Sequence, residues 1–180
     1  MDNQIILACD DNGKFLEYIP KAIGHTGEGR RHIAITVLLF NSKNQVLLQK
    51  RKHQVFNNLW DFTASTHPLH KEGEADETLE QATLRSLKME YDIDNHINLD
   101  NLGSFNYFAQ NGKFCENEHC AMMLGQYEGE VNLDPKVGYE CKWVDLNDFF
   151  KDVSNNPNNY APWVIEGVKV LKKEFACNCC

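Results

Sequence analysis

The chain has 180 residues, of which 42% are hydrophobic and 24% charged, a composition typical of one globular domain with a sizeable core. Its formal net charge of −8 argues against general nucleic-acid binding, so an anionic substrate would have to meet a local basic cluster. Because the sequence has no apolar run of membrane-spanning length and no signal-peptide pattern, we expect a cytoplasmic protein without a membrane span.

The seven cysteines predict free thiols rather than a disulfide framework, because their number is odd and no secretion signal is present. Three of them stand in the terminal sequence CNCC, which fits the aliphatic prenylation pattern poorly. We therefore expect a single domain over residues 1–176 and a loose, metal-sticky Cys-rich tail at 177–180.

The first part of the chain predicts four strands. Residues 4–9 form the first, and the turn sequence DDNG leads into the second at 15–18, followed by a polar segment. Residues 32–40 (HIAITVLLF) are apolar and β-branched nearly throughout, as in a buried central strand. The fourth strand, at 45–50, ends in KRK, the densest positive charge in the sequence.

The stretch from Trp60 to Asp92 predicts an extended run, a polar turn and an acidic helix. Three acidic residues are expected in the first helical turn, where they would complement the helix dipole: Glu74, Asp76 and Glu77. One inward face collects residues at spacings of three and four: Leu79, Ala82, Thr83 and Ser86. Glu90 falls on the same stripe and either ends a fraying helix or serves a site, since burying a carboxylate alone is costly.

The second half of the chain predicts strands at 102–109, 114–127 and 140–144, then helices at 146–153 and 161–175, the last opened by Pro162. No internal repeat or linker divides it. This order predicts an α/β (α+β) domain with a mixed sheet between helical layers.

Five side chains could together bind one divalent cation. Glu116 and Glu118 project from one face of a predicted strand, where like carboxylates repel unless a cation or a shared proton compensates. His25, His32 and His67 are candidate partners, although each alone is more often a packed or surface histidine. Three histidines and two glutamates are too oxygen-rich for a closed zinc site and suit Mg²⁺ or Mn²⁺. A solvated acidic pair is the alternative.

The predicted helix resembles a degraded Nudix box, G-x5-E-x7-R-E-U-x-E-E-x-G-U with U aliphatic. The matching residues are Glu77, Arg85, Leu87, Glu90 and Ile93. The departures are Lys71, Ser86, Met89 and Asp92. Ser86 and Met89 replace glutamates that metal-dependent Nudix hydrolases use for metal binding and base chemistry.

These departures from the Nudix box resemble those of type I isopentenyl-diphosphate isomerases, which share the Nudix fold. The resemblance runs from about residue 4 to residue 173. It rests jointly on His25-Thr26, His32, Leu39-Phe40-Asn41, Gln45, Arg51, Trp60, His67-Pro68, Glu90, Glu116-Asn117-Glu118, Trp143 and Pro162-Trp163. It implies a Nudix fold and a reaction that moves a double bond by protonating one carbon and deprotonating another.

The resemblance implies two cations and a diphosphate site. One ion would have five ligands: His25, His32, His67, Glu116 and Glu118. Glu90 matches the carboxylate that helps hold a second ion, Mg²⁺, bridging to the diphosphate. Lys21 and Arg51 match diphosphate-contacting positions, and Lys52 could assist them. The family arginine that would fall at Ser86 is absent.

The resemblance also implies an acid–base pair and one exchanged residue. Glu118, with Tyr107 beside it, would supply one acid/base group, and Trp163 would face the developing carbocation, worth about 1–2 kcal/mol. The family's catalytic cysteine falls at Ser65. A hydroxyl ionises near ~15.7 and a thiol near ~8.5, so forming the anion costs up to about 10 kcal/mol more.

Three functions follow from these expectations. The protein is an isomerase of isopentenyl diphosphate, slowed by Ser65, a Nudix hydrolase of another diphosphate metabolite, or a catalytically weak diphosphate-binding protein. In each case the partner is a small-molecule diphosphate, with no nucleic acid, and the protein is a monomer or homodimer.

Overall fold

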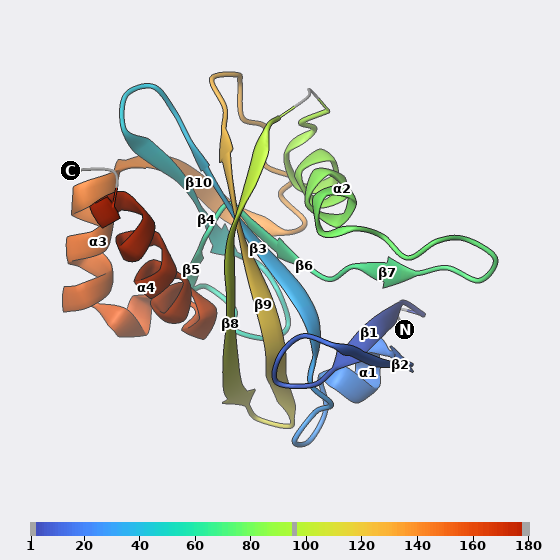
Figure 1. Ribbon diagram of the computed structural model, residues 1–180. Coiled ribbons are helices and arrows are strands. Elements are labelled where there is room, and N and C mark those ends of the chain that lie inside the picture. Colours follow the sequence, from blue (N-terminus) through green and yellow to red (C-terminus); the bar gives the residue numbers. More distant parts are fainter. Residues whose placement is uncertain (1–2, 95–96, 178–180) are drawn as a thin grey trace.

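The computed structural model describes residues 3–94 and 97–177, in which helices flank one mixed sheet (Figure 1). The strands are β1 (Ile5–Cys9), β2 (Phe15–Pro20), β3 (His32–Phe40), β4 (Gln45–Arg51), β5 (Trp60–Asp61), β6 (Ala64–Thr66), β7 (Leu69–His70), β8 (Leu99–Asn111), β9 (Phe114–Gln126) and β10 (Gly138–Asp145). The helices are α1 (Lys21–Gly24), α2 (Leu79–Tyr91), α3 (Leu146–Asn155), the 3₁₀ helix η1 (Pro157–Asn159) and α4 (Pro162–Cys177).

Strand β3 is the centre of the sheet. It pairs in parallel with β9 over its whole length, and antiparallel with β1, β4 and β6. The β3–β9 register sets His32 opposite Glu118, and the antiparallel β8–β9 register sets Tyr107 opposite the same residue. Three neighbouring strands therefore bring polar residues of the predicted site to one level of the sheet.

Both faces of β3 are buried because successive side chains alternate between two cores. Ala34 and Leu38 pack in the core that holds α3 and α4, whereas Ile35, Val37 and Leu39 pack in the core of α2. Figure 1 shows α2 on one side of the sheet and α3 with α4 on the other. The predicted mixed sheet between helices is confirmed, and its apolar central strand follows from this double burial.

The predicted first turn of the acidic helix is wrong. Helix α2 begins at Leu79, and Thr78 caps it by accepting from Gln81 N while the Gln81 side chain accepts from Thr78 N. This reciprocal cap ends the preceding loop, so the predicted first-turn acids lie before the helix: Glu74, Asp76 and Glu77. The buried inward face is confirmed at Ala82, Thr83 and Ser86.

Smaller differences concern short elements. The polar segment after β2 contains α1, and the extended run before α2 contains three short strands, β5 to β7. Strand β8 covers Leu99–Asn111 rather than 102–109. Of the predicted Cys-rich tail, residue 177 ends α4, and residues 178–180 lie outside the described residues. Across the part of the chain that is described, no helix has the length and apolar character needed to span a membrane.

The loop between β6 and α2, which carries His67, is tied down by one ion pair. Arg85 Nε and Nη2 donate to the two carboxylate oxygens of Glu77 at 2.8 and 2.9 Å, and Nη2 also donates to His67 O at 2.8 Å. Leu69 N donates to Glu77 Oε2 at 3.0 Å. A bidentate guanidinium–carboxylate pair is among the stronger polar contacts in proteins, so it fixes the backbone of His67.

Replacing Arg85 by Ala should lower the free energy of unfolding by about 1–3 kcal/mol, because it removes several charge-assisted hydrogen bonds. Lys88→Ala, which removes exposed ion pairs from the same helix, should change it by less than about 0.5 kcal/mol. Urea titration of both variants measures the difference, and equal effects would contradict the assignment.

The Arg85→Ala effect should also depend on pH. Burial raises the pKa of Glu77, but the Arg85 and Leu69 hydrogen bonds outweigh burial and hold it below its ordinary value of 4.5. A group whose pKa is lower in the folded state than in the unfolded state stabilises the fold at pH values above its unfolded pKa. This contribution is lost as the pH falls through the folded-state pKa. The gap between wild type and Arg85→Ala should therefore narrow below about pH 4.5.

Candidate active site

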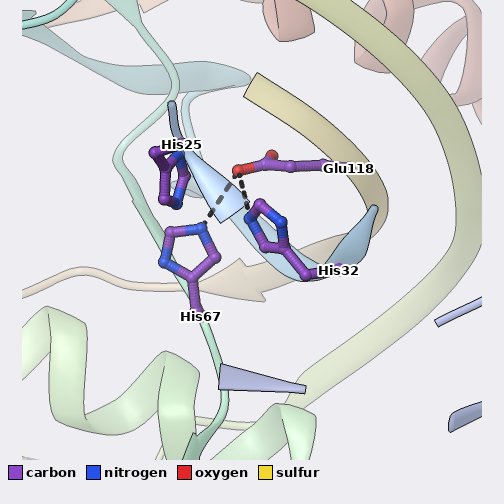
Figure 2. Close-up of side chains that lie close together, drawn as sticks. All are labelled: His25, His32, His67 and Glu118. Carbon is purple, nitrogen blue, oxygen red and sulfur yellow. Dashed lines mark hydrogen bonds and ion pairs between the residues drawn. The ribbon is translucent and has the colours of Figure 1, made fainter. Parts of the chain in front are cut away.

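Four of the predicted metal ligands come together in space. His25 follows α1, His32 opens β3, His67 lies between β6 and β7, and Glu118 comes from β9. Each offers one ligand atom, and these atoms all lie within 4.8 Å of one another. Figure 2 shows the three imidazoles around the carboxylate, with Glu118 Oε1 3.0 Å from His67 Nε2 and 3.6 Å from His32 Nε2.

The histidines are oriented as metal ligands usually are. His32 Nδ1 lies 2.8 Å from Arg30 O, and a carbonyl only accepts, so this nitrogen carries the hydrogen. His32 Nε2 and His25 Nε2 are both buried without a hydrogen-bond partner among the described residues. A second-shell carbonyl that fixes the tautomer is the common arrangement behind a ligating histidine.

The protonation states favour a cation at this place. Burial, together with the charges of the neighbouring histidines and Lys21, holds the pKa of His67 well below 6.5, so its ring is neutral. Burial raises the pKa of Glu118, but the nearby His32 ring and the hydrogen bond from Tyr107 outweigh it and lower the pKa, so the carboxyl is ionised. A neutral His67 and an ionised Glu118, with two further imidazoles beside them, are a donor set that fits a divalent transition-metal ion or Mn²⁺.

Two predicted ligands lie outside this group of four. Glu116 Oε2 lies 2.8 Å from His25 Nδ1, on the side of the ring away from the orphaned nitrogen. Glu90 is the last residue but one of α2, whose end is capped at Asp92 rather than frayed, and it accepts from Gln49 at 2.7 Å and from Ser86 at 3.1 Å. Burial raises the pKa of Glu90 to about 7, so it ionises only partly at neutral pH.

Two cavities adjoin the cluster. A small one of about 50 Å³ is lined by Ser65, His67, Tyr107, Glu118, Cys120 and Trp163, among others. A wider cleft of about 450 Å³ is lined by Lys21, His25, Arg51, His53, Thr66 and Phe114, among others. The two cavities are adjacent, because they share these lining residues: Arg51, Ser65, Thr66, His67 and Glu116.

The small cavity holds a proton donor next to the carboxylate. The Tyr107 hydroxyl donates to Glu118 Oε2. Burial and the charges of Glu118 and Glu116 raise the pKa of Tyr107 well above 10, so it keeps its proton at neutral pH. Trp163 is 3% exposed, and its ring centroid lies 6.0 Å from that of Tyr107. Catalytic residues expected from the sequence thus share one wall of this cavity.

The basic residues divide between the cleft and the surface. Lys21 and Arg51 line the wide cleft, whereas Lys52 donates to Pro135 O at 2.8 Å and lines neither cavity. His53 was missed by the sequence analysis although it directly follows the KRK segment. Burial and the charges of Arg51 and Lys21 lower the pKa of His53 to about 4, so it enters the cleft as a neutral group.

Asp61 was also missed. Its carboxylate is 1% exposed and binds Arg51 Nη1 and Trp163 Nε1, both at 2.6 Å. The Arg51 guanidinium lies over the Trp163 ring at 4.6 Å from its centroid. No sequence spacing links these three residues, because they meet only when α4 packs against β4 and β5.

Comparison with known proteins identifies the family to which the chain is related. The model of the NUDIX domain family matches residues 30–164. The chain is 30% identical over 167 residues to isopentenyl-diphosphate Delta-isomerase 2 of Aromatoleum aromaticum, covering 91% of this chain and 84% of that protein. Isopentenyl-diphosphate Delta-isomerase 1 of the same organism is 31% identical over 167 residues, with 91% and 89% covered.

Solved structures agree on the fold. A Deinococcus radiodurans protein superposes with a TM-score of 0.63 at 15% identity, covering 85% of this chain and 90% of that one. The MutT protein of Methanosarcina mazei superposes with a TM-score of 0.62 at 18% identity, covering 80% and 94%. The predicted fold and family are confirmed: the chain belongs to the Nudix family and, within it, to the isopentenyl-diphosphate isomerases.

Proposed function

We propose that the protein is a metal-dependent isomerase that converts isopentenyl diphosphate to dimethylallyl diphosphate. One observation carries the proposal: the cluster of three histidines and Glu118 borders a small cavity whose walls also hold Tyr107 and Ser65. Isomerisation needs a proton donor and a proton acceptor at two carbons of one substrate, and a narrow shared cavity can present both.

The ion would be held by His25, His32, His67 and Glu118, with Glu116 beside His25 as a candidate fifth ligand. When bound, a divalent ion such as Mn²⁺ or Mg²⁺ supplies a fixed positive charge that offsets the buried carboxylate. Within the described part of the chain, the buried Nε2 atoms of His25 and His32 have no hydrogen-bond partner, which supports this assignment. Glu90 is a weaker candidate for a Mg²⁺ ligand, since Gln49 and Ser86 already bind its oxygens.

The chain's own residues would divide the reaction between them. Tyr107 and Glu118 donate and relay the proton that adds to the substrate's terminal carbon, because Tyr107 keeps its proton at neutral pH. Trp163 borders the same cavity and would lie beside the tertiary cation, worth about 1–2 kcal/mol. Lys21 and Arg51 would meet the diphosphate in the wide cleft. Ser65 would then face the carbon that loses its proton.

A Nudix hydrolase of another diphosphate metabolite is the second candidate, favoured by the absence of the family cysteine at Ser65. Two observations weigh against it. Ser86 replaces a metal-binding glutamate and bonds Glu90, and Met89 replaces another and is 64% exposed.

Incubation with a panel of nucleoside diphosphate derivatives should therefore release phosphate or diphosphate slowly, since two carboxylates of the hydrolase box are missing. Fast release that is abolished by Glu90→Gln would establish the hydrolase instead. Tight binding of diphosphates without either turnover would establish the catalytically weak binding protein.

The metal assignment predicts that His67→Ala and Glu118→Gln lose most of their bound ion, because each removes a donor from the four-residue cluster. His119→Ala is the matched control. His119 neighbours Glu118 on β9 but bonds Asn106 at 2.7 Å on the other face of the strand. Metal analysis of purified protein and the shift of the melting temperature with added Mn²⁺ measure the effect. Equal metal content in all variants would exclude this site.

The serine substitution predicts that Ser65→Cys raises the rate of isomerisation. A thiol changes its protonation near neutral pH, and general acid–base help is typically worth about 10²–10⁴-fold. The measurement is conversion of isopentenyl diphosphate at matched metal content, with Ser65→Ala as control. If Ser65→Ala is as fast as wild type, Ser65 takes no part in proton transfer.

A further inference from the structure

A buried carboxylate lies directly behind Ser65. Asp61 ends β5, and its Oδ1 and Oδ2 lie 3.4 and 3.3 Å from Ser65 Oγ. Oδ1 also accepts from Phe62 N at 2.7 Å and from Trp163 Nε1 at 2.6 Å, while Arg51 Nη1 binds Oδ2 at 2.6 Å. Asp61 lines neither cavity, so it can reach a substrate only through a neighbour.

The direction of the hydrogen bonds at Ser65 can be assigned. An ionised carboxylate only accepts, so the Ser65 hydroxyl donates to Asp61. The β3–β6 register sets Thr36 opposite Ser65, and the two hydroxyl oxygens lie 3.0 Å apart. Thr36 Oγ1 also lies 3.4 Å from Ala64 O, but with the Ser65 hydrogen directed to Asp61, Thr36 donates over the shorter distance, to Ser65. One lone pair of Ser65 Oγ is left, on a residue that lines the small cavity.

A relay in which Ser65 passes its hydroxyl hydrogen to Asp61 removes the main obstacle to proton transfer by a serine at this position. Forming a free alkoxide would be prohibitive, because water-like hydroxyls ionise near ~15.7. If the hydroxyl hydrogen moves to Asp61 as another proton arrives, Ser65 stays neutral throughout. Burial raises the pKa of Asp61 above its ordinary value of 3.8, although Arg51 opposes the shift, so it is a better proton acceptor than an exposed aspartate.

We propose that Asp61 is a positioning residue that acts through Ser65 as the final proton acceptor of the isomerisation. The substrate C–H bond breaks, and its electron pair forms the new double bond at the cationic carbon. The proton passes to Ser65 Oγ, and the original hydroxyl proton passes to an Asp61 oxygen. No oxidant or reductant is consumed. The inference rests on the proposed isomerase function.

A double-mutant cycle tests the relay. Asp61→Asn keeps the size of the side chain but cannot take up a proton, so in the wild-type background kcat should fall by about 100-fold or more. In the Ser65→Cys background, where the thiol itself can hold the proton, the same substitution should reduce kcat by less than about tenfold. If Asp61 only supports Arg51 and Trp163, both backgrounds lose equally, and that result overturns the inference.

A second variant covers the case in which Asp61→Asn folds poorly with an unpaired Arg51. Thr36→Val leaves Asp61 and its ion pair intact but removes the donor that orients Ser65. It should lower kcat in the wild-type background and change it little in the Ser65→Cys background. Equal losses in both backgrounds again overturn the relay. Urea titration and metal content of each variant show that the fold and the cluster are retained.

The same measurements separate the inference from the proposed function. If the wild type isomerises the substrate but Asp61→Asn reduces kcat equally in both backgrounds, the relay through Asp61 is excluded and the isomerase function is retained. Activity of Ser65→Cys without measurable activity of wild type also removes the relay, since Ser65 and Asp61 would then transfer no proton. If neither the wild type nor Ser65→Cys isomerises the substrate with the ion bound, both the proposed function and the relay are excluded.

Discussion

The burial of the Glu118 carboxylate is the constraint on which the site depends. Only 5% of this residue is exposed, and an unpaired charge at that depth would be strongly unfavourable. The sheet supplies its partners through strand register, with His32 opposite it on β3 and Tyr107 opposite it on β8. His67 reaches it from a loop that Arg85 and Glu77 hold in place. Pairing of the backbone thus determines where the charge is compensated.

A second buried charge, Asp61, is bonded to three residues that line the small cavity: Arg51, Ser65 and Trp163. Asp61 is as deeply buried as the apolar core, and its compensation comes from Arg51 and from donors of β6 and α4. Removing one partner of such a pair typically costs more than the pair contributes, since the other charge is left buried. Arg51 therefore pairs with the internal carboxylate and also lines the wide cleft, and its buried Nε has no hydrogen-bond partner among the described residues.

The parts of the fold that were predicted from sequence are those in which one segment carries its own signal. The apolar run of β3 and the inward stripe of α2 result from burial on regular elements, and both are confirmed. The start of α2 was misplaced, because acidic residues suit a helix dipole and an ion pair equally well. Glu77 takes part in the ion pair with Arg85, and Thr78 provides the cap.

The site was only partly predictable for a related reason. His25, His32, His67 and Glu118 were candidate ligands by residue type and a ligand set by the family resemblance, whereas their convergence depends on a parallel pairing of β3 with β9 across about 80 residues. Asp61 and His53 carry no pattern of their own. They stand in a two-residue strand and in a loop, and Trp163, which binds Asp61, comes from a helix and lies 102 residues further along the chain.

The two buried carboxylates, Glu118 and Asp61, explain how a serine at position 65 would take part in proton transfer. A thiol needs no partner to change its protonation near neutral pH, whereas a hydroxyl must pass its hydrogen to a stronger base. Ser65 donates to the Asp61 carboxylate, accepts from Thr36 on the paired strand, and lines the small cavity. Glu118 with Tyr107 lines the same cavity, so the proton that enters and the proton that leaves would have separate carboxylates. Keeping the two apart lets each retain the charge that its own step requires.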